Sequence, residues 1–328
     1  MELEIHQKHE HQQPKDLPGV LVVTPPPPMA IFGDKFLVSE KFKLLKACES
    51  PLPLEEFLIS NSQSIQAKLC TCYGPVTLEI LRLLPSLRLV VTASAGVNHI
   101  NLPECRRHGI SVTNSGNVFS DDCADVAVGL LIDVWRKVSD ADRYVRQGLW
   151  MSRGDYALGS KLGPRAKLVG PPTDFFKYYW KQIGIVGLGK IGLEVAKRLE
   201  AFGCTILYNS RKEKPAVSYT FYSNICQLAA NSNALIICCG LTDQTRHMID
   251  RQVLLALGKN GEIGGAGLDV FENEPNVPQE LFAMDNVVMS PHNAAFTTES
   301  FMALCDLVVG NLEAFFTNKP LLSPVIDD

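Results

Sequence analysis

A glycine-rich turn near the middle of the chain could bind the phosphates of a dinucleotide. Its six residues are Gly187, Leu188, Gly189, Lys190, Ile191 and Gly192, which give the spacing G-x-G-x-x-G. The first glycine permits a tight turn, the second lets the backbone approach a pyrophosphate, and the third lets a helix pack closely on a strand. The N-terminus of the following helix adds unpaired N–H groups and a partial positive charge. We therefore predict a dinucleotide site here rather than a purely structural turn.

The elements that must position this turn can be read on either side of it. The apolar run Ile183–Val186 is typical of a buried parallel strand. Apolar residues then recur at helical spacing from Leu193 to Leu199, with charged residues between them. This order of strand, turn and helix makes the glycine spacing far more specific than it would be alone.

The residues after the next predicted strand, Cys204–Tyr208, indicate which dinucleotide is bound. An NAD site needs Asp or Glu at this point, to bind the ribose hydroxyl. The sequence instead has Ser210, Arg211 and Lys212, with no carboxylate before Glu213. A hydroxyl and two cations can hydrogen-bond and neutralise a 2′-phosphate, which a carboxylate would repel. We predict NADP(H) as the cofactor; an ordinary basic loop is the alternative.

Composition and charge exclude several other classes of protein. The 328 residues are 46% hydrophobic and 20% charged, which suits a globular protein of two domains. A net charge of −4 gives no sign of nucleic-acid binding, and no stretch is apolar for long enough to span a membrane. The ten cysteines include no C-x-x-C pair, so we expect reduced thiols in the cytosol and no metal site. Residues 1–18 are expected to be a disordered tail.

Strands and helices are expected to alternate along the chain, which indicates parallel sheets. The further strands are expected at Gly19–Thr24, Lys68–Tyr73, Leu87–Thr92, Ile110–Thr113, Ala234–Cys239, Gly264–Val270 and Val287–Ser290. The further helices are expected at Phe42–Cys48, Thr77–Leu84, Asp121–Arg136 with a continuation through Ser139–Gln147, Ser223–Ala230, Met248–Leu257 and Phe301–Phe316. The segment Gly163–Lys181, rich in proline and aromatic residues, is expected to be a long loop.

Several motifs taken together resemble the D-isomer-specific 2-hydroxyacid dehydrogenases. They are GLGKIG, GLTDQTRHMI, GAGLDVFENEP and SPHNAA, in this order, and the earlier SAGVNHINL resembles the substrate loop of that family. The nearest branch comprises the plant-type glyoxylate/hydroxypyruvate reductases and hydroxyphenylpyruvate reductase, and Ser-Arg-Lys after the second strand fits its preference for NADPH.

The resemblance implies an α/β fold of two Rossmann-like, doubly wound lobes with a cleft between them. The substrate domain would comprise residues 19–118 and 303–328, and the NAD(P)-binding domain residues 119–302. It also implies a homodimer assembled through the Rossmann lobes, for which the Asp121–Gln147 helix is the expected contact. The implied activity is reduction of a small 2-keto acid (hydroxypyruvate, glyoxylate or hydroxyphenylpyruvate) to a D-2-hydroxy acid by NADPH.

Reduction of a keto group needs a hydride at the carbon and a proton at the oxygen, so a general acid is required. His292, exposed at a strand end by Pro291, suits this role, and the histidine of the SPH motif performs it in the family. Glu274 aligns with the carboxylate that pairs with that histidine and stabilises its protonated form. A surface histidine and an ordinary loop acid are the alternatives.

The resemblance also assigns binding residues. The backbone N–H groups of Ala95, Gly96 and Val97 would hold the substrate carboxylate, since glycine permits a close approach. Asp269 would hydrogen-bond the nicotinamide amide, with a strand-end cap as the alternative. Leu241 and Thr242, after the strand Ala234–Cys239, would line the path of the adenine ribose, with a plain loop as the alternative.

Two departures from the family pattern lie in this chain. The family carries a catalytic arginine in a turn that follows a strand and precedes a helix. The sequence Gly258–Gly264 instead connects one predicted helix directly to the next strand, so the strand, the arginine and a helix are missing. Gly163–Lys181 looks like an insertion. The second hypothesis is therefore a non-catalytic NADP-binding member of the family, or a variant arising from a faulty gene model.

Overall fold

The computed structural model describes residues 17–25, 29, 40–71, 74–157, 159–162, 181–258 and 263–325, and the backbone of two strands at 165–168 and 176–179. The chain divides into two compact units. One comprises the residues up to Gly116 together with those from Met302 onward, and the other runs from Asn117 to Phe301. Nearly all of the predicted tail, residues 1–18, lies outside the described residues.

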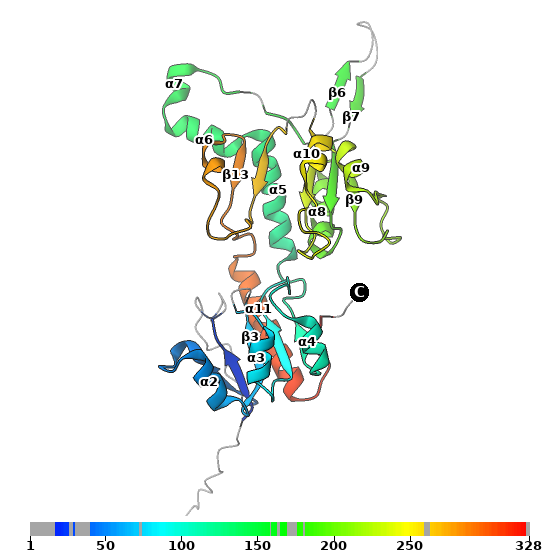
Figure 1. The fold of residues 1–328 in the computed structure, drawn as a ribbon. Coiled ribbons are helices and arrows are strands. Elements are labelled where there is room, and N and C mark those ends of the chain that lie inside the picture. Colours follow the sequence, from blue (N-terminus) through cyan, green and yellow to red (C-terminus); the bar gives the residue numbers. More distant parts are fainter. Residues whose placement is uncertain are drawn as a thin grey trace, which may run out of the picture. The chain divides into compact units, whose positions relative to one another are not determined.

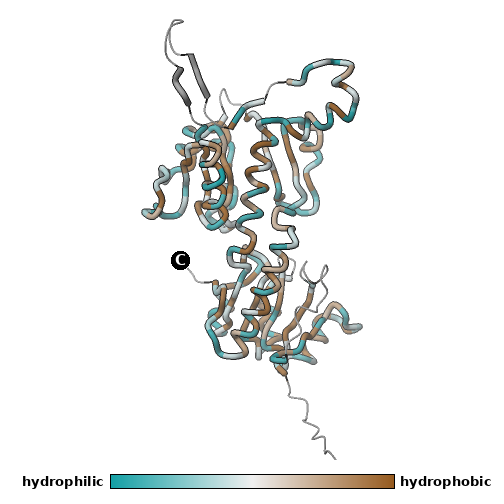
Figure 2. The backbone as a smooth tube through the Cα atoms, turned by 180° about the vertical axis from the view of Figure 1, so that it is seen from behind, coloured by the Kyte–Doolittle hydropathy of each residue, from teal (hydrophilic) through white to brown (hydrophobic). Residues whose placement is uncertain are grey.

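The first unit is built on a five-stranded parallel sheet in the order β2-β1-β3-β4-β5, which is a doubly wound order. Its strands are mostly buried, since both faces of such a sheet are covered. Figure 2 shows the central strands as hydrophobic stretches and the helices as alternating ones. The elements are β1 Gly19–Val22, β2 Lys43–Lys46, η2 Ala47–Glu49, α2 Leu54–Asn61, β3 Ile65–Cys70, α3 Leu78–Leu83, β4 Leu89–Thr92, α4 Leu102–Arg107 and β5 Ser111–Thr113.

The prediction of a helix over Phe42–Cys48 is wrong. Lys43–Lys46 forms the strand β2, which pairs in parallel with β1 from Gly19↔Lys43 to Val22↔Lys46. A run this short carries no period that distinguishes a helix from a strand, so pairing with the neighbouring strand decides its structure. The helix expected at Thr77–Leu84 is confirmed, with the Thr77 hydroxyl as its N-terminal cap.

The second unit contains a four-stranded parallel sheet in the order β10-β9-β8-β11. This order is that of the first four strands of a dinucleotide-binding fold, and it reverses between β8 and β11. The elements are α5 Ser120–Arg136, α6 Val138–Arg146, α7 Leu149–Arg153, β6 Arg165–Leu168, β7 Phe176–Tyr179, β8 Gln182–Val186, α8 Lys190–Ala201, β9 Thr205–Asn209, β10 Thr220–Phe221, α9 Ile225–Ala230, β11 Ala234–Ile237, α10 Arg251–Leu257, β12 Ala266–Leu268, η3 Gln279–Ala283, β13 Val287–Met289 and α11 Thr298–Phe316, which enters the first unit at Met302.

The sheet of the second unit is interrupted after β11. In the described residues, β12 pairs only with β13 and β11 pairs only with β8, so the two half-sheets share no ladder. Helix α5 supports both of them (Figure 1). A side chain at Gly267 would collide with Leu130 of α5, so glycine lets β12 lie directly against the helix. On its other side, α5 is joined to α8 by ion pairs from Arg198 to Asp121 and Asp125.

Two further expectations need correction. The helix that starts at Ser120 does not run on through Gln147, because Lys137 takes a left-handed conformation (φ 54°) and separates α5 from α6. The segment Gly163–Lys181 is not entirely loop, because β6 and β7 pair as an antiparallel hairpin. Its remaining residues up to 180 lie outside the described part of the chain.

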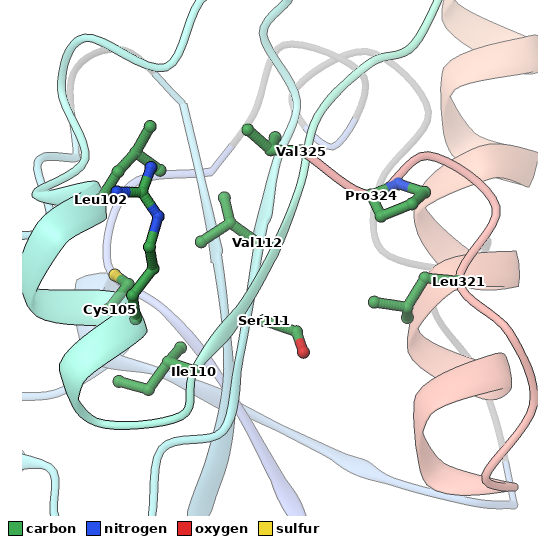
Figure 3. A pocket seen from close by; sticks show the side chains of 9 residues that line it. Leu102, Cys105, Ile110, Ser111, Val112, Leu321, Pro324 and Val325 are labelled. Atoms are coloured by element: carbon green, nitrogen blue, oxygen red, sulfur yellow. The ribbon is translucent and has the colours of Figure 1, made fainter. Parts of the chain in front are cut away.

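A pocket of the first unit lies between α4, β5 and the C-terminal segment (Figure 3). Its volume is about 160 Å³, and none of the predicted site residues lines it. No described helix combines the length and apolar character needed to cross a bilayer.

Candidate active site

The glycine turn between β8 and α8 has the geometry that its spacing predicts. Gly187 has φ 93°, and a side chain there would collide with the backbone of Cys239 at the end of β11. A side chain on Gly189 would meet nothing within 4 Å, so the backbone is open to an approaching group. A side chain on Gly192 would overlap the carbonyl oxygen of Gly187, so only glycine lets the helix pack this closely. Leu188 is buried in the core beneath the turn, together with Ile183 and Ile185 of β8.

The helix that follows the turn presents its first N–H groups at the open glycine. Gly189 is the N-terminal cap of α8, with extended backbone and no side chain to satisfy these donors. Lys190 is exposed and Ile191 is partly buried. A pyrophosphate fits this position because it supplies acceptors and negative charge at the positive end of a helix dipole.

The end of β9 presents a cationic loop. The Ser210 hydroxyl donates to the carbonyl of Lys212, which closes a short turn, and the side chains of Arg211 and Lys212 are exposed. Asn209 donates to the carbonyl of Tyr222, which fixes the backbone just before this turn. The loop lies at the carboxyl edge of the sheet, as does the glycine turn after the adjacent strand β8.

The loop after β11 is ordered by a pair of threonines. The Thr245 hydroxyl donates to the carbonyl of Gly240 at 2.7 Å, and the N–H of Thr242 donates to the Thr245 hydroxyl at 2.7 Å. Leu241 and Thr242 are exposed in this loop. They lie beside the point where the strand order reverses, which is where open α/β sheets bind ligands.

The structure brings His292 and Glu274 together. His292 Nδ1 lies 2.6 Å from Glu274 Oε2, and the other carboxylate oxygen accepts the N–H of Phe271 at 2.9 Å. Burial raises the pKa of Glu274, but hydrogen bonds from His292 and Phe271 outweigh it, so the net pKa lies below its ordinary value. A carboxylate only accepts, so Nδ1 carries a proton and Nε2 is the nitrogen available for proton transfer.

Asp269 lies beside this pair, at the end of β12. Its Oδ1 accepts the N–H of Asn293, the residue after His292, at 3.2 Å. The Ser290 hydroxyl donates to the Asn293 side chain at 2.8 Å. These bonds fix the loop after β13 from both sides and hold the backbone that carries the histidine.

The predicted carboxylate-binding loop belongs to the first unit and follows β4. Among the described residues, no acceptor meets the backbone N–H groups of Ala95, Gly96 or Val97. The carbonyls on this loop are engaged instead, because Asn114 donates to that of Ala95 and the Ser94 hydroxyl to that of Gly96. Three unpaired donors on one loop can bind an anion.

Sequence reasoning missed a polar network below this loop. The Thr92 hydroxyl contacts the Ser94 hydroxyl at 2.7 Å and His99 Nε2 at 3.1 Å. Lys68 is fully buried and donates to the carbonyls of Gly74 and Pro75, both at 3.0 Å. Burial lowers the pKa of Lys68 and, together with the charge of Lys68, that of His99. The signal was a lysine within a mostly apolar strand.

Sequence reasoning also missed a contact between the loops after β11 and β12. Arg246 Nη1 lies 3.9 Å from Glu272 Oε1. No regular spacing links the two residues, so only the fold shows that they meet.

Comparison with known proteins identifies the family. Residues 128–260 and 249–294 match the NAD binding domain of the D-isomer specific 2-hydroxyacid dehydrogenases. A glyoxylate/hydroxypyruvate reductase of Arabidopsis thaliana is 46% identical over 322 aligned positions, which cover 91% of this chain and 95% of that protein. A hydroxyphenylpyruvate reductase of Plectranthus scutellarioides is 39% identical, with 94% of this chain and 99% of that protein covered.

The chain belongs to the D-isomer specific 2-hydroxyacid dehydrogenase family. Its fold agrees with this assignment. An NADPH-dependent glyoxylate/hydroxypyruvate reductase of Sinorhizobium meliloti, solved with NADP and malonate, has a TM-score of 0.79 at 28% identity, with 95% of this chain and 97% of that chain covered. The protein is therefore a member of a family of oxidoreductases with an NAD-binding domain, and the two doubly wound units are those of a 2-hydroxyacid dehydrogenase.

The alignments also bear on the interrupted sheet of this dehydrogenase. The alignment with the Arabidopsis reductase has 322 positions but spans 91% of 328 residues, so about two dozen positions of the relative have no counterpart here. The family match is divided into two segments that meet at residues 249–260. In the structure, this is where α10 leads to β12 and where the ladder between β11 and β12 is absent from the described residues.

Proposed function

We propose that this dehydrogenase reduces small 2-keto acids to D-2-hydroxy acids with NADPH as the hydride donor. The observation that carries the proposal is the 2.6 Å contact between His292 and Glu274 at the carboxyl edge of a nucleotide-binding fold. A histidine held by a carboxylate can act as a general acid. The relatives named above add support, since the Arabidopsis and Plectranthus proteins are reductases of hydroxypyruvate, glyoxylate and hydroxyphenylpyruvate.

The residues of this chain would divide the work as follows. Glu274 orients the imidazole through Nδ1 and stabilises its protonated form. Nε2 of His292 then donates a proton to the keto oxygen as charge develops there. The N–H groups of Ala95, Gly96 and Val97 bind the carboxylate of the substrate. NADPH would supply the hydride when bound, and Asp269 would accept a hydrogen bond from its carboxamide.

The residues around the glycine turn fit a phosphorylated dinucleotide. The open space at Gly189 and the unpaired start of α8 suit a pyrophosphate. Ser210, Arg211 and Lys212 would hold the 2′-phosphate that distinguishes NADP from NAD. Leu241 and Thr242 would line the adenosine side. Residues 119–302 would thus form the NAD(P)-binding domain, and residues 19–118 with 303–328 the substrate domain.

Because the arginine-bearing segment of the family is missing, we expect a lower rate of keto-acid reduction. A guanidinium that binds the carboxylate and polarises the carbonyl is worth about 10²–10³ in rate, by analogy with oxyanion donors. We therefore expect slow turnover by this chain. The test is NADPH oxidation with hydroxypyruvate, glyoxylate and 4-hydroxyphenylpyruvate as separate substrates.

The test includes a second protein, in which an arginine-bearing strand and helix are restored after Asn260. Its matched control carries glutamine in place of the restored arginine. We expect fast turnover only with the restored arginine and slow turnover in the other two proteins. If the restored protein also fails to oxidise NADPH with every substrate, the chain is a non-catalytic nucleotide-binding protein.

We also propose a cytosolic homodimer. The nine cysteines in the described residues are all free thiols, which suits a reducing compartment. Helices α6 and α7 expose Val138, Val145, Trp150 and Met151, and large exposed apolar residues in one region are typical of a subunit contact. Light scattering after gel filtration tests the dimer, and V145E with W150E should yield monomers.

A further inference from the structure

An ion pair joins the two loops that meet across the interrupted sheet. Arg246 follows β11, Glu272 follows β12, and their charged atoms lie 3.9 Å apart. The pair therefore lies at the carboxyl edge of both half-sheets, the edge that also carries the glycine turn and His292.

The backbone at Arg246 is fixed even though its side chain is exposed. Its N–H donates to the carbonyl of Thr242 at 2.8 Å, within the turn that Thr245 closes. The next residue, His247, has φ 57°, so the chain changes direction immediately after the arginine. A fixed backbone lowers the entropy that is lost when the guanidinium binds a ligand.

The partner carboxylate is easily displaced. The side chains of Arg246 and Glu272 are 56% and 73% exposed, and their contact is long. Exposed pairs of this kind contribute little to stability, because water and salt compete with them. Another carboxylate that forms a bidentate contact with the guanidinium would bind it more strongly than Glu272 does.

The partner of the guanidinium belongs to the same loop as the partner of the candidate proton donor. Glu272 is two residues from Glu274, which is at most about 7 Å along the chain, and Glu274 holds His292 at 2.6 Å. A 2-keto acid carries its carboxylate and its keto oxygen on adjacent carbons. Its recognition therefore requires a cation and a proton donor at the same edge of the fold, and Arg246 and His292 both follow strands at their carboxyl ends.

We propose that Arg246 binds the carboxylate of the 2-keto acid, which takes the place of Glu272. The proposal rests on the proposed function. It assigns to this exposed pair a role in substrate recognition and makes Glu272 a competitor for the same guanidinium.

The test measures binding of oxamate, which carries a carboxylate next to an amide carbonyl, to the full chain saturated with NADPH. R246Q removes the proposed contact and R246K keeps the charge without the bidentate geometry. R251Q is the matched control, because Arg251 is an exposed arginine five residues away at the start of α10. E272Q removes the competing carboxylate. Affinity for NADPH is measured in every variant by calorimetry.

We expect R246Q to weaken oxamate binding roughly ten- to hundredfold, the usual value of hydrogen bonds to a charged group. R246K should be intermediate, R251Q should stay within about twofold, and E272Q should bind oxamate more tightly. Affinity for NADPH should not change. Equal effects of R246Q and R251Q would overturn the proposal, as would the absence of oxamate binding by the unmodified chain.

Turnover separates this proposal from the proposed function. If the unmodified chain and R246Q reduce hydroxypyruvate equally well, the function stands and the role of Arg246 is wrong. If no protein reduces a keto acid but oxamate binds in an Arg246-dependent manner, the binding role stands and the function is wrong.

Discussion

Nδ1 of His292 lies 2.6 Å from Oε2 of Glu274, although the two residues are 18 positions apart and follow different strands. His292 has φ 51°, a left-handed conformation that costs a residue other than glycine about 1–3 kcal/mol. The hydrogen bonds of Asn293 and Asp269 hold the chain in this conformation. The strained backbone thus presents the imidazole to the carboxylate of Glu274.

Replacing Glu274 should reduce turnover more than substrate binding. In E274Q the amide keeps the size of the carboxylate but no longer stabilises the imidazolium. We expect kcat to fall about 10²-fold, within the range of general acid catalysis, with KM changed little. Steady-state NADPH oxidation measures both. E280Q is the control, since Glu280 is an exposed acid on η3, and an equal loss in E280Q would contradict the role of Glu274.

Glu274 should also make stability depend on pH. Its pKa in the folded protein is below the ordinary value of 4.5, so the folded state binds its proton more weakly than the unfolded state. The stabilisation is complete above that ordinary value and is lost as pH falls through the lower, folded-state pKa. The Tm difference between the unmodified chain and E274Q should therefore be largest near pH 6 and shrink towards pH 3.5. A difference that grows on acidification would mean that folding raises the pKa of Glu274 instead of lowering it.

Replacing Gly189 and replacing Gly192 should have different effects, one on NADPH affinity and the other on thermal stability. In G192A the new methyl group overlaps the Gly187 carbonyl, and overpacking of this kind costs about 1–3 kcal/mol. For a domain of this size we expect Tm to fall by roughly 2–10 °C. In G189A the methyl group points into open space, so Tm should hold while affinity for NADPH falls at least about tenfold.

Calorimetry and thermal melting separate these two outcomes. Equal loss of Tm in both variants would mean that Gly189 has a structural role, and unchanged affinity in G189A would place the pyrophosphate elsewhere.

The cationic loop after β9 should determine the choice between cofactors. Removing both charges in R211Q/K212Q should raise KM for NADPH about tenfold or more, because each lost hydrogen bond to a phosphate is worth about 1.5–3 kcal/mol. KM for NADH should change little, since NADH has no 2′-phosphate. K197Q is the control, because Lys197 is an exposed cation on α8 outside this loop. Parallel changes for both cofactors would contradict a role in selection.

The sequence predicted the strand, turn and helix around Gly187 because local rules govern all three. Three glycines in fixed register allow few structures, and the φ of Gly187 and the tight packing at Gly192 follow from them. The expected helix over Phe42–Cys48 failed because β2 is specified by its neighbour β1 and not by its own period. The end of α5 at Lys137 was missed for a related reason, since a left-handed lysine has no sequence signature.

The site shows the same division between local and long-range information. Glu274 and His292 were found from a sequence motif. Arg246 and Glu272 were not, because their contact depends on how the loops after β11 and β12 meet in the fold. The Lys68 network was hidden for another reason. The buried Lys68 donates to backbone carbonyls of Gly74 and Pro75, and no residue type in the sequence indicates which carbonyls will accept these hydrogen bonds.

The interrupted sheet has a consequence for how this dehydrogenase opens. A continuous parallel sheet couples its strands through one ladder, but in the described residues β12 and β13 share no ladder with β8–β11 and pack against α5. The two strands β12 and β13 can therefore separate from α5 without breaking the half-sheet β10-β9-β8-β11. Its amides should exchange with solvent as a foldon of their own, with an opening free energy below that of β8 and β9. Because β13 leads directly to His292, the proton donor should open together with these two strands.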